Sequence, residues 1–166
     1  MFITGINVLE IVRANLSNPL HADALISLMK IYALDPMGGN KVLSEYTTAN
    51  LVKSLNDRND VYVILAYLQS EAVGLVTCIE GFSTFACKPL LNIHDAIVKK
   101  EYRHQGILTK LLSEAENIAI EKDCCKLTLE VLEGNIPAQS AYAKFGFCGY
   151  ELDPKMGKAL FWEKVL

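Results

Sequence analysis

The sequence lacks the features that mark membrane and exported proteins. Hydrophobic residues make up 51% of the 166, but no stretch approaches the roughly 18 uninterrupted apolar residues that a membrane helix requires. The start, MFITGINVLEIVRANL, is interrupted by Asn7, Glu10 and Arg13, which argues against a secretory signal. We therefore expect a soluble, cytoplasmic protein with no membrane partner.

Paired cysteines and an excess of basic residues are also missing. The cysteine count is odd and includes no C-x-x-C pair, so we expect no metal and mostly packed, reduced thiols. The 16 Lys and Arg against 19 Asp and Glu disfavour nucleic acid as a partner. The cysteines are Cys78, Cys87, Cys124, Cys125 and Cys148.

No repeat, low-complexity tract or flexible linker divides the chain. A chain of this length can bury about 70% of the surface that its unfolded form exposes. We therefore expect one domain over residues 1–166.

Apolar periodicity indicates an α/β protein with the element order βααββ followed by βαβαββ. Helices are expected over 21–34, from Ser44 onward, over 107–123 and over 137–144. Strands are expected over 8–14, 61–68, 72–82, 90–98, 126–132 and 159–166. The strand-helix-strand run from 90 to 132 predicts a parallel crossover, and the neighbouring hairpins predict antiparallel pairing. One mixed sheet flanked by helices follows.

The stretch EYRHQGILTKLL (101–112) places a glycine directly before an apolar helix. The first turn of a helix has unsatisfied N–H groups that suit a phosphate. Gly106 leaves the backbone open, Arg103 and His104 can donate, and Thr109 adds a hydroxyl. The alternative is that Gly106 only ends a turn. The stretch is neither a Walker A loop nor a dinucleotide fingerprint, which argues against nucleotide hydrolysis and hydride transfer.

Residues 103–108 resemble the acyl-CoA motif [QR]-x-x-G-x-[GA] of the GNAT acetyltransferases. Leu108 departs from the small residue of that motif, and Lys100 stands where the family often has proline. Residues 129–147 resemble the family's following strand and helix, N-x-x-A-x-x-x-Y-x-x-x-G-F. The matching residues there are Asn135, Ala138, Tyr142, Gly146 and Phe147. The alternative is that Tyr142 and Phe147 are core aromatics.

The resemblance implies a single GNAT domain whose acyl-CoA-binding core covers about residues 90–150, and leaves a homodimer open. It implies acetyl transfer from acetyl-CoA to a primary amine, on a small molecule or amino acid, by direct attack in a ternary complex. A bulge at 96–98 would present the amides of Ile97 and Val98 to the pantetheine arm and the thioester oxygen. The implied cofactor-binding residues are Ile97, Val98, Arg103, His104, Gln105, Gly106, Ile107, Leu108, Thr109, Asn135, Ala138 and Tyr142.

By the same resemblance Tyr142 would protonate the departing thiolate, unless it is only a packed tyrosine. The base that takes the amine proton stays open, because Glu80, His94, Asp95 and Glu130 could each face the cleft. Asp95 could instead simply bond local backbone, and water could serve as the base. Loops 35–40 and 81–89 would select the acceptor, with Phe82 and Phe85 lining a pocket or acting as hydrophobic plugs.

Three other functions remain open at this point. They are a CoA-binding regulatory module without turnover, a protein N-terminal acetyltransferase and a phosphate-binding domain that does not take CoA.

Overall fold

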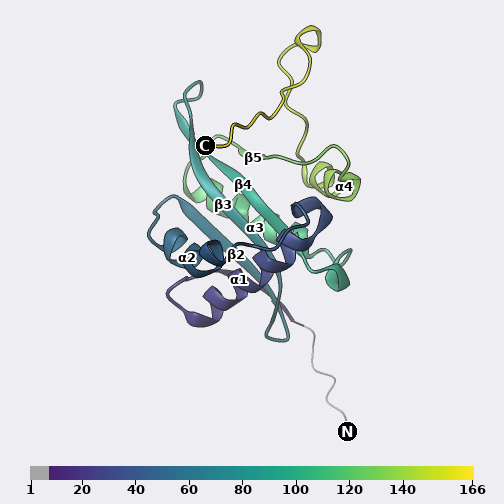
Figure 1. Ribbon diagram of the computed structural model, residues 1–166. Coiled ribbons are helices and arrows are strands. Elements are labelled where there is room, and N and C mark those ends of the chain that lie inside the picture. Colours follow the sequence, from purple (N-terminus) through teal and green to yellow (C-terminus); the bar gives the residue numbers. More distant parts are fainter. Residues whose placement is uncertain (1–7) are drawn as a thin grey trace. The chain divides into compact units, whose positions relative to one another are not determined.

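The computed structural model describes residues 8–166, which fall into two compact units that divide between Leu129 and Glu130. Figure 1 shows the helices and strands of both units along the chain. Part of the segment that argued against a secretory signal, residues 1–7, lies outside the described residues. One domain over 1–166 stays a prediction.

The first unit is built on one five-stranded sheet in the order β1-β2-β3-β4-β5. The strands are β1 (Leu9–Arg13), β2 (Val61–Leu68), β3 (Glu71–Ser83), β4 (Lys88–Val98) and β5 (Leu127–Leu129). Neighbours from β1 to β4 pair antiparallel, and β5 pairs parallel with β4. The predicted hairpins and the predicted parallel crossover are therefore confirmed.

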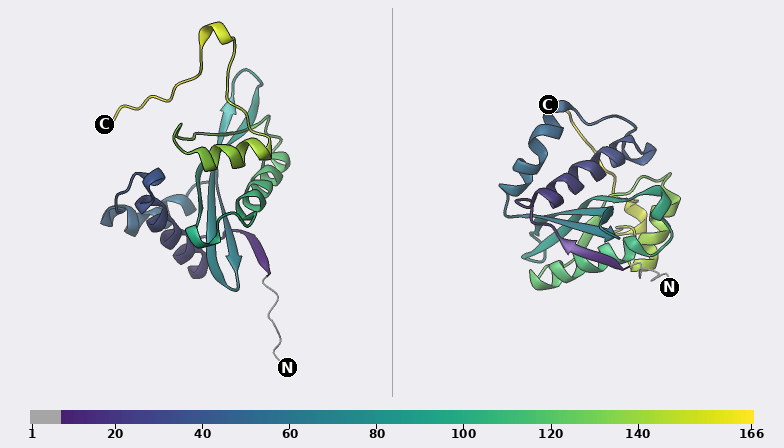
Figure 2. Two further views of the ribbon diagram at one scale, coloured as in Figure 1. Left: turned by 90° about the vertical axis from the view of Figure 1, so that its right-hand side faces the viewer. Right: turned by 90° about the horizontal axis from the view of Figure 1, so that it is seen from below.

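Helices cover both faces of this sheet. The helices of this unit are α1 (Pro19–Leu34), α2 (Glu45–Asn56) and α3 (Ile107–Glu121), with short 3-10 helices η1 (Pro36–Gly38) and η2 (Lys100–Tyr102). In Figure 2, α1 and α2 lie on one face and α3 lies on the other. The predicted mixed sheet flanked by helices is confirmed.

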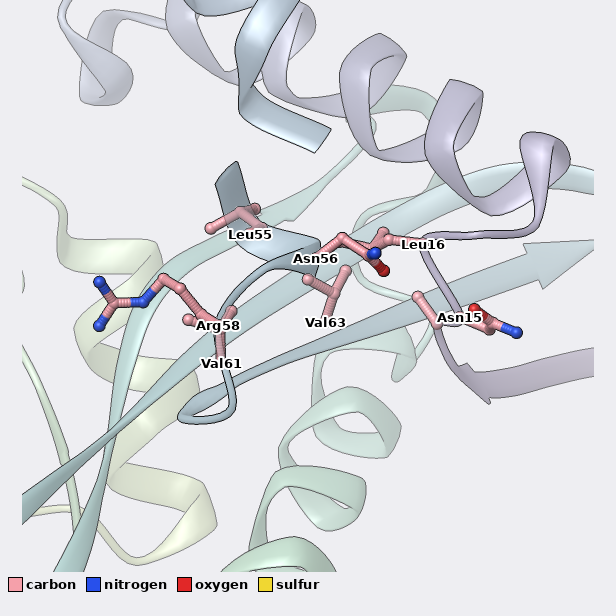
Figure 3. A pocket seen from close by; sticks show the side chains of 8 residues that line it. Asn15, Leu16, Leu55, Asn56, Arg58, Val61 and Val63 are labelled. Atoms are coloured by element: carbon pink, nitrogen blue, oxygen red, sulfur yellow. The ribbon is translucent and has the colours of Figure 1, made fainter. Parts of the chain in front are cut away.

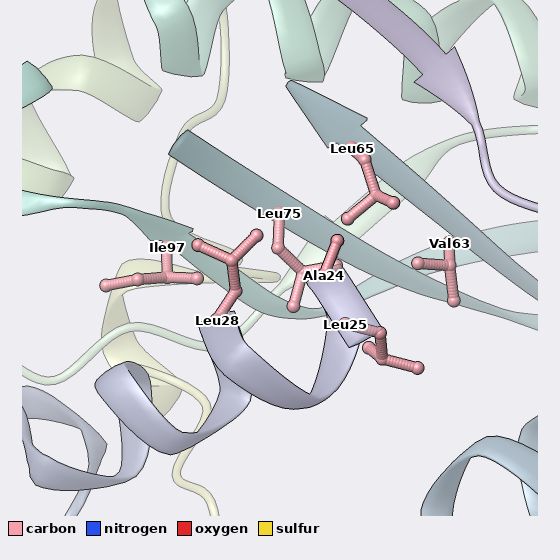
Figure 4. Packing of buried hydrophobic residues seen from close by; sticks show 7 residues of the cluster. All are labelled: Ala24, Leu25, Leu28, Val63, Leu65, Leu75 and Ile97. Carbon is pink, nitrogen blue, oxygen red and sulfur yellow. The ribbon is translucent and has the colours of Figure 1, made fainter. Parts of the chain in front are cut away.

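Strand periodicity divides the apolar residues between two cores. The core on the α1 face consists of Ala24, Leu25, Leu28, Val63, Leu65, Leu75 and Ile97 (Figure 4). On the other face, a Cβ added at Gly74 would meet Leu111 Cδ1 at 3.1 Å and Ile107 Cγ2 at 3.4 Å. Glycine at this position therefore lets α3 approach β3 closely.

Local signals set several element ends as predicted. Ser44 caps α2 by accepting the Thr47 N–H at 3.0 Å, and Glu45 occupies the first turn. Gln69 and Ser70, both with positive φ, form the tight turn between β2 and β3, in the conformation that suits the twist of a hairpin.

The second unit contains α4 (Ile136–Phe145) and the 3-10 helix η3 (Pro154–Met156). None of the described residues after Leu129 forms a strand, so the two strands expected after the last helix, including that over 159–166, are wrong. Residues 157–166 are exposed. Their alternating apolar pattern favours a strand, but a strand requires a hydrogen-bonded neighbour, and this unit supplies none.

The expectation that most cysteines are packed is also wrong. All are free thiols, but only Cys78 is buried, while Cys124 is half-buried. The others lie at exposed positions, Cys87, Cys125 and Cys148. A cysteine in a turn or loop does not belong to the apolar face of a helix or strand, so the fold does not require its side chain to be buried.

Candidate active site

β4 carries one extra residue at the point where it parts from β5. Thr77 of β3 lies opposite Asp95 while the next residue, Cys78, lies opposite Ile93, so His94 is a β-bulge. Pairing with β5 ends at Ile93. Residues 94–98 therefore run on without a strand on that side, and we call this side the open edge of β4. The bulge expected at 96–98 lies instead at His94.

The strand register decides which amides face the open edge. Lys99 donates its N–H to the Val73 carbonyl at 2.9 Å, and Ile97 lies opposite Leu75 in the same register. Because hydrogen-bonding direction alternates along an antiparallel strand, the Ile97 N–H points toward β3 and those of Ala96 and Val98 point toward the open edge.

Of the two implied amides, the register therefore turns Val98 to the open edge and Ile97 away from it. Ala96 was missed by sequence reasoning. Its position two residues before Val98 is the signal that could have found it, because residues two apart on a strand direct their amides the same way.

The segment Arg103–Gly106, here called the α3 loop, leads from η2 into α3. Gly106 occupies the N-cap position at φ 78°, and no side chain caps the helix. His104 also has positive φ, at 64°, and is exposed. The first-turn N–H groups of Ile107, Leu108 and Thr109 therefore lack a capping side chain, which is the arrangement in which a helix start can hold an anion.

Arg103 connects the α3 loop to two distant parts of the first unit. Its Nε donates to the Val98 carbonyl at 2.9 Å, and its Nη2 donates to Asp35 Oδ2 at 2.8 Å. The hydrogen bond from Arg103 holds the pKa of the Asp35 carboxyl below its usual range. Arg103 thus fixes the loop against the end of α1, and Gln105 reaches back to the Glu101 carbonyl at 3.4 Å.

Glu80 lies far along the sheet from the α3 loop. Its Oε2 accepts a hydrogen bond from Tyr62 at 2.8 Å, and Lys122 Nζ lies 5.3 Å from the centre of the Tyr62 ring. Lys122 directly follows α3, so Glu80 is near the C-terminal end of that helix while the loop is at its N-terminal end. The structure does not bring Glu80 together with the loop.

The other candidate bases occupy different positions. His94 is exposed at the bulge, beside the open edge. Asp95 follows it and is half-buried. Burial raises the pKa of the Asp95 carboxyl, and the His94 charge opposes that rise. Glu130 is exposed at the beginning of the second unit.

The second motif builds α4. Asn135 Oδ1 caps this helix by accepting the Ala138 N–H at 3.3 Å. At the other end, Gly146 has φ 115°, and the Tyr142 carbonyl accepts the N–H groups of Gly146 and Phe147. The Tyr142 ring meets Phe147 edge-on at 5.9 Å between centroids. Two motif residues therefore set the ends of α4, since Asn135 begins the helix and Gly146 ends it.

The acceptor-side residues and the cavity lie apart from these groups. Phe82 and Phe85, on the β3–β4 hairpin, are both exposed. A cavity of about 150 Å³ (Figure 3) contains none of the predicted site residues. It is lined by Ala14, Asn15, Leu16, Leu55, Asn56, Arg58, Val61 and Val63.

Within residues 8–166, no cluster of three or more His, Cys, Asp or Glu side chains could hold a metal ion. No helix in this described part of the chain is long and apolar enough to cross a membrane.

Comparison with known proteins gives a family match across most of the chain. The model of the acetyltransferase (GNAT) family matches residues 25–147. An uncharacterized N-acetyltransferase of Archaeoglobus fulgidus is 36% identical over 95 residues, which cover 57% of this chain and 65% of that protein. Further curated relatives are covered over 33% to 45% of their lengths. The chain thus matches less than two thirds of each of these relatives.

Solved structures share the fold at low sequence identity. An aminoglycoside acetyltransferase from an uncultured soil metagenomic sample has a TM-score of 0.74 at 23% identity, over 95% of this chain and 97% of that one. The aminoglycoside N-acetyltransferase AAC(6')-Iy, solved in complex with CoA, has a TM-score of 0.75 at 14% identity, over 98% and 99% of the two chains.

Proposed function

Since the chain belongs to the acetyltransferase (GNAT) family, we propose that it is an N-acetyltransferase that transfers an acetyl group from acetyl-CoA to a primary amine. One arrangement carries this proposal. α3 begins at Gly106 without a capping side chain, and a few residues earlier the Val98 N–H points to the open edge of β4, where β5 no longer pairs. The hydrogen bond from Arg103 to the Val98 carbonyl ties the two together.

These groups fit the parts of acetyl-CoA. The N–H groups of Ile107, Leu108 and Thr109 would hold the pyrophosphate, with Gly106 leaving space for its approach and exposed His104 adding a donor. The amides of Ala96 and Val98 would hold the pantetheine arm and the thioester oxygen.

The second motif supplies further residues for which we propose a role in binding acetyl-CoA. Asn135 would bind the pantetheine arm through its side-chain amide, whose carbonyl oxygen already caps α4, and Ala138 would lie beside it. When bound, acetyl-CoA supplies an acyl group activated as a thioester.

In the proposed transfer, the acceptor nitrogen attacks the thioester carbon directly while both substrates are bound. An amide N–H directed at the thioester oxygen stabilises the negative charge that develops there. Tyr142 would return a proton to the departing sulfur, which a phenol can do because its ordinary pKa lies near 10 and that of a thiol near 8.5.

We propose a small-molecule amine as the acceptor. This proposal is supported by solved structures of similar fold whose names describe aminoglycoside acetyltransferases. A protein N-terminal amine is the alternative acceptor.

The test mixes the protein with acetyl-CoA and a panel of amines and follows thiol release. The panel contains aminoglycosides, polyamines, amino acids and peptides with free N-termini. Thiol release that depends on an amine, with a mass gain of one acetyl group on that amine, supports the proposal. Tight acetyl-CoA binding without amine-dependent release across the panel would favour a regulatory module. Equal competition by phosphate and CoA in a thermal-shift assay would favour a phosphate-binding domain.

A further inference from the structure

Asp95 lies on the α1 face of the sheet, one residue beyond the bulge. Ile97, two residues further along β4, directs its side chain into the α1-face core with Leu28, so Asp95 points to the same face. Tyr32 follows Leu28 by one turn of α1 and packs against this core. Burial first, and then the charges of Asp95 and Asp35, raise the pKa of the Tyr32 hydroxyl.

The Asp95 carboxylate has no cationic partner to balance it. Among the described residues, the ion pairs include one for Asp35, with Arg103, and none for Asp95. The buried Thr77 hydroxyl favours the charged form of Asp95 through a hydrogen bond, but it brings no charge of its own. A half-buried carboxylate without a cation is costly to keep in its charged form.

Among the described residues whose charge acts on Asp95, His94 is the only one that can be positive. From β3 come Thr77 and Cys78, and burial raises the pKa of the Cys78 thiol to about 12, so this thiol stays neutral. From α1 and its C-terminal end come Tyr32 and Asp35. His94 itself is exposed, and its charge is screened by solvent.

The position of Asp95 is next to the amide that would hold the thioester oxygen. Ala96, the following residue, directs its N–H to the open edge of β4, beyond the end of β5. In acyl transfer the attacking nitrogen must approach the carbon bonded to that oxygen. Asp95 is one residue away from that amide along β4, and its carboxylate lies on the α1 face of the sheet,.

We propose that Asp95 receives the acceptor amine. Its carboxylate pairs with the ammonium ion and takes one proton from it, which gives the neutral amine and a protonated Asp95. The nitrogen then bonds to the acetyl carbon, and the carbon–sulfur bond breaks with its electron pair on sulfur. The proposed general acid protonates the thiolate and recovers its proton from the nitrogen, which loses its second proton. Asp95 afterwards loses its proton to solvent. This inference rests on the proposed acetyl transfer.

The test compares Asp95→Asn with the wild type and with Asp123→Asn. Asp123 is exposed in the turn after α3, and asparagine tolerates its positive φ of 52°,. For an amine that the wild type acetylates, kcat/KM should fall by about 10² or more in Asp95→Asn and stay unchanged in Asp123→Asn. The Kd for CoA should stay within about twofold in both variants, because tenfold already corresponds to about 1.4 kcal/mol.

Thermal unfolding gives a second readout that does not depend on activity. A folded-state pKa raised above the unfolded value means that ionised Asp95 destabilises the fold at neutral pH, and that this cost disappears below the unfolded pKa near 3.9. Asp95→Asn should therefore raise the Tm by about 2–4 °C at pH 7. That difference should vanish near pH 3.5.

The outcomes separate this inference from the function on which it rests. If the wild type acetylates an amine and Asp95→Asn does so equally well, the inference is wrong and acetyl transfer stands. If Asp95→Asn loses activity and also lowers the Tm at pH 7, Asp95 is a structural residue and the inference is wrong. If the wild type acetylates no amine in the panel, both fail together.

Discussion

Gly106 is the residue on which the cofactor proposal depends most directly. A Cβ at this position would meet nothing within 4 Å, but φ of 78° strains any other residue. Gly106→Glu should weaken CoA binding by about tenfold or more, because a negative charge at a helix start opposes a bound anion by about 1–2 kcal/mol. Isothermal titration with CoA measures this loss.

Gly106→Asn is the matched control, since asparagine adopts positive φ more readily than other residues and carries no charge. It should bind CoA far better than Gly106→Glu. If the two variants bind CoA equally well, the charge at this position is irrelevant and the α3 loop is only a turn.

Tyr142 is predicted to act on rate rather than on affinity. Tyr142→Phe removes only the hydroxyl and should keep the edge-on contact with Phe147. Turnover should fall by about 10² to 10⁴ while the CoA dissociation constant stays nearly unchanged. Tyr46→Phe, at an exposed tyrosine of α2, is the control. Wild-type turnover in Tyr142→Phe would leave Tyr142 as a packed aromatic.

The role of a single residue could be predicted from the sequence where it depends only on neighbouring residues in the chain. A glycine before an apolar period predicts a helix start, and Gly106 is the N-cap. The partners of Arg103 could not be found in this way, because Asp35 lies 68 positions away in the sequence. Asp95 could not be preferred over the other candidate bases for the same reason, since its lack of a cation is visible only when α1 and β3 are in place.

At the scale of elements, the contact between Arg103 and Asp35 joins the end of α1 to the α3 loop. A depressed pKa in the folded state means that ionised Asp35 stabilises the fold above its unfolded pKa near 3.9, and that this contribution is lost as the pH falls through the folded value. The Arg103 and Asp35 side chains are 38% and 20% exposed, so solvent screening limits the effect to at most about 1 kcal/mol.

Arg103→Gln should therefore lower the free energy of unfolding at pH 7 by more than it does at pH 3. Urea unfolding at both pH values measures the difference. Asp35→Asn should show the same pH dependence, because asparagine can still accept the Met37 N–H that Asp35 accepts, and the double variant should add little. A loss that does not change with pH would show that the lost bond to the Val98 carbonyl matters more than the ion pair.

The ends of helices and strands were predicted best where a capping residue or a turn defines them. They were predicted least well where the pairing between strands defines them. Ser44 begins α2 as expected, and Gly146 ends α4. The strand expected over 126–132 stops at Leu129 because β4 bulges at His94 and parts from β5. Such a bulge depends on how two strands pair, so it cannot be predicted from the sequence of one strand.

At the scale of the whole molecule, the periodicity predicted the mixed sheet and its helical covering, and the family match over residues 25–147 confirms the resemblance. What periodicity could not supply is the acceptor. Side chains that select a substrate need no regular spacing, and Phe82 and Phe85 are exposed rather than gathered in a pocket.

A crystal structure of the protein with acetyl-CoA tests the central claim most directly. The account predicts pyrophosphate oxygens within hydrogen-bonding distance of the N–H groups of residues 107–109, and the thioester oxygen on the open edge of β4 at Ala96 or Val98. Pyrophosphate bound away from the start of α3, or a thioester oxygen that contacts neither amide, would contradict the account.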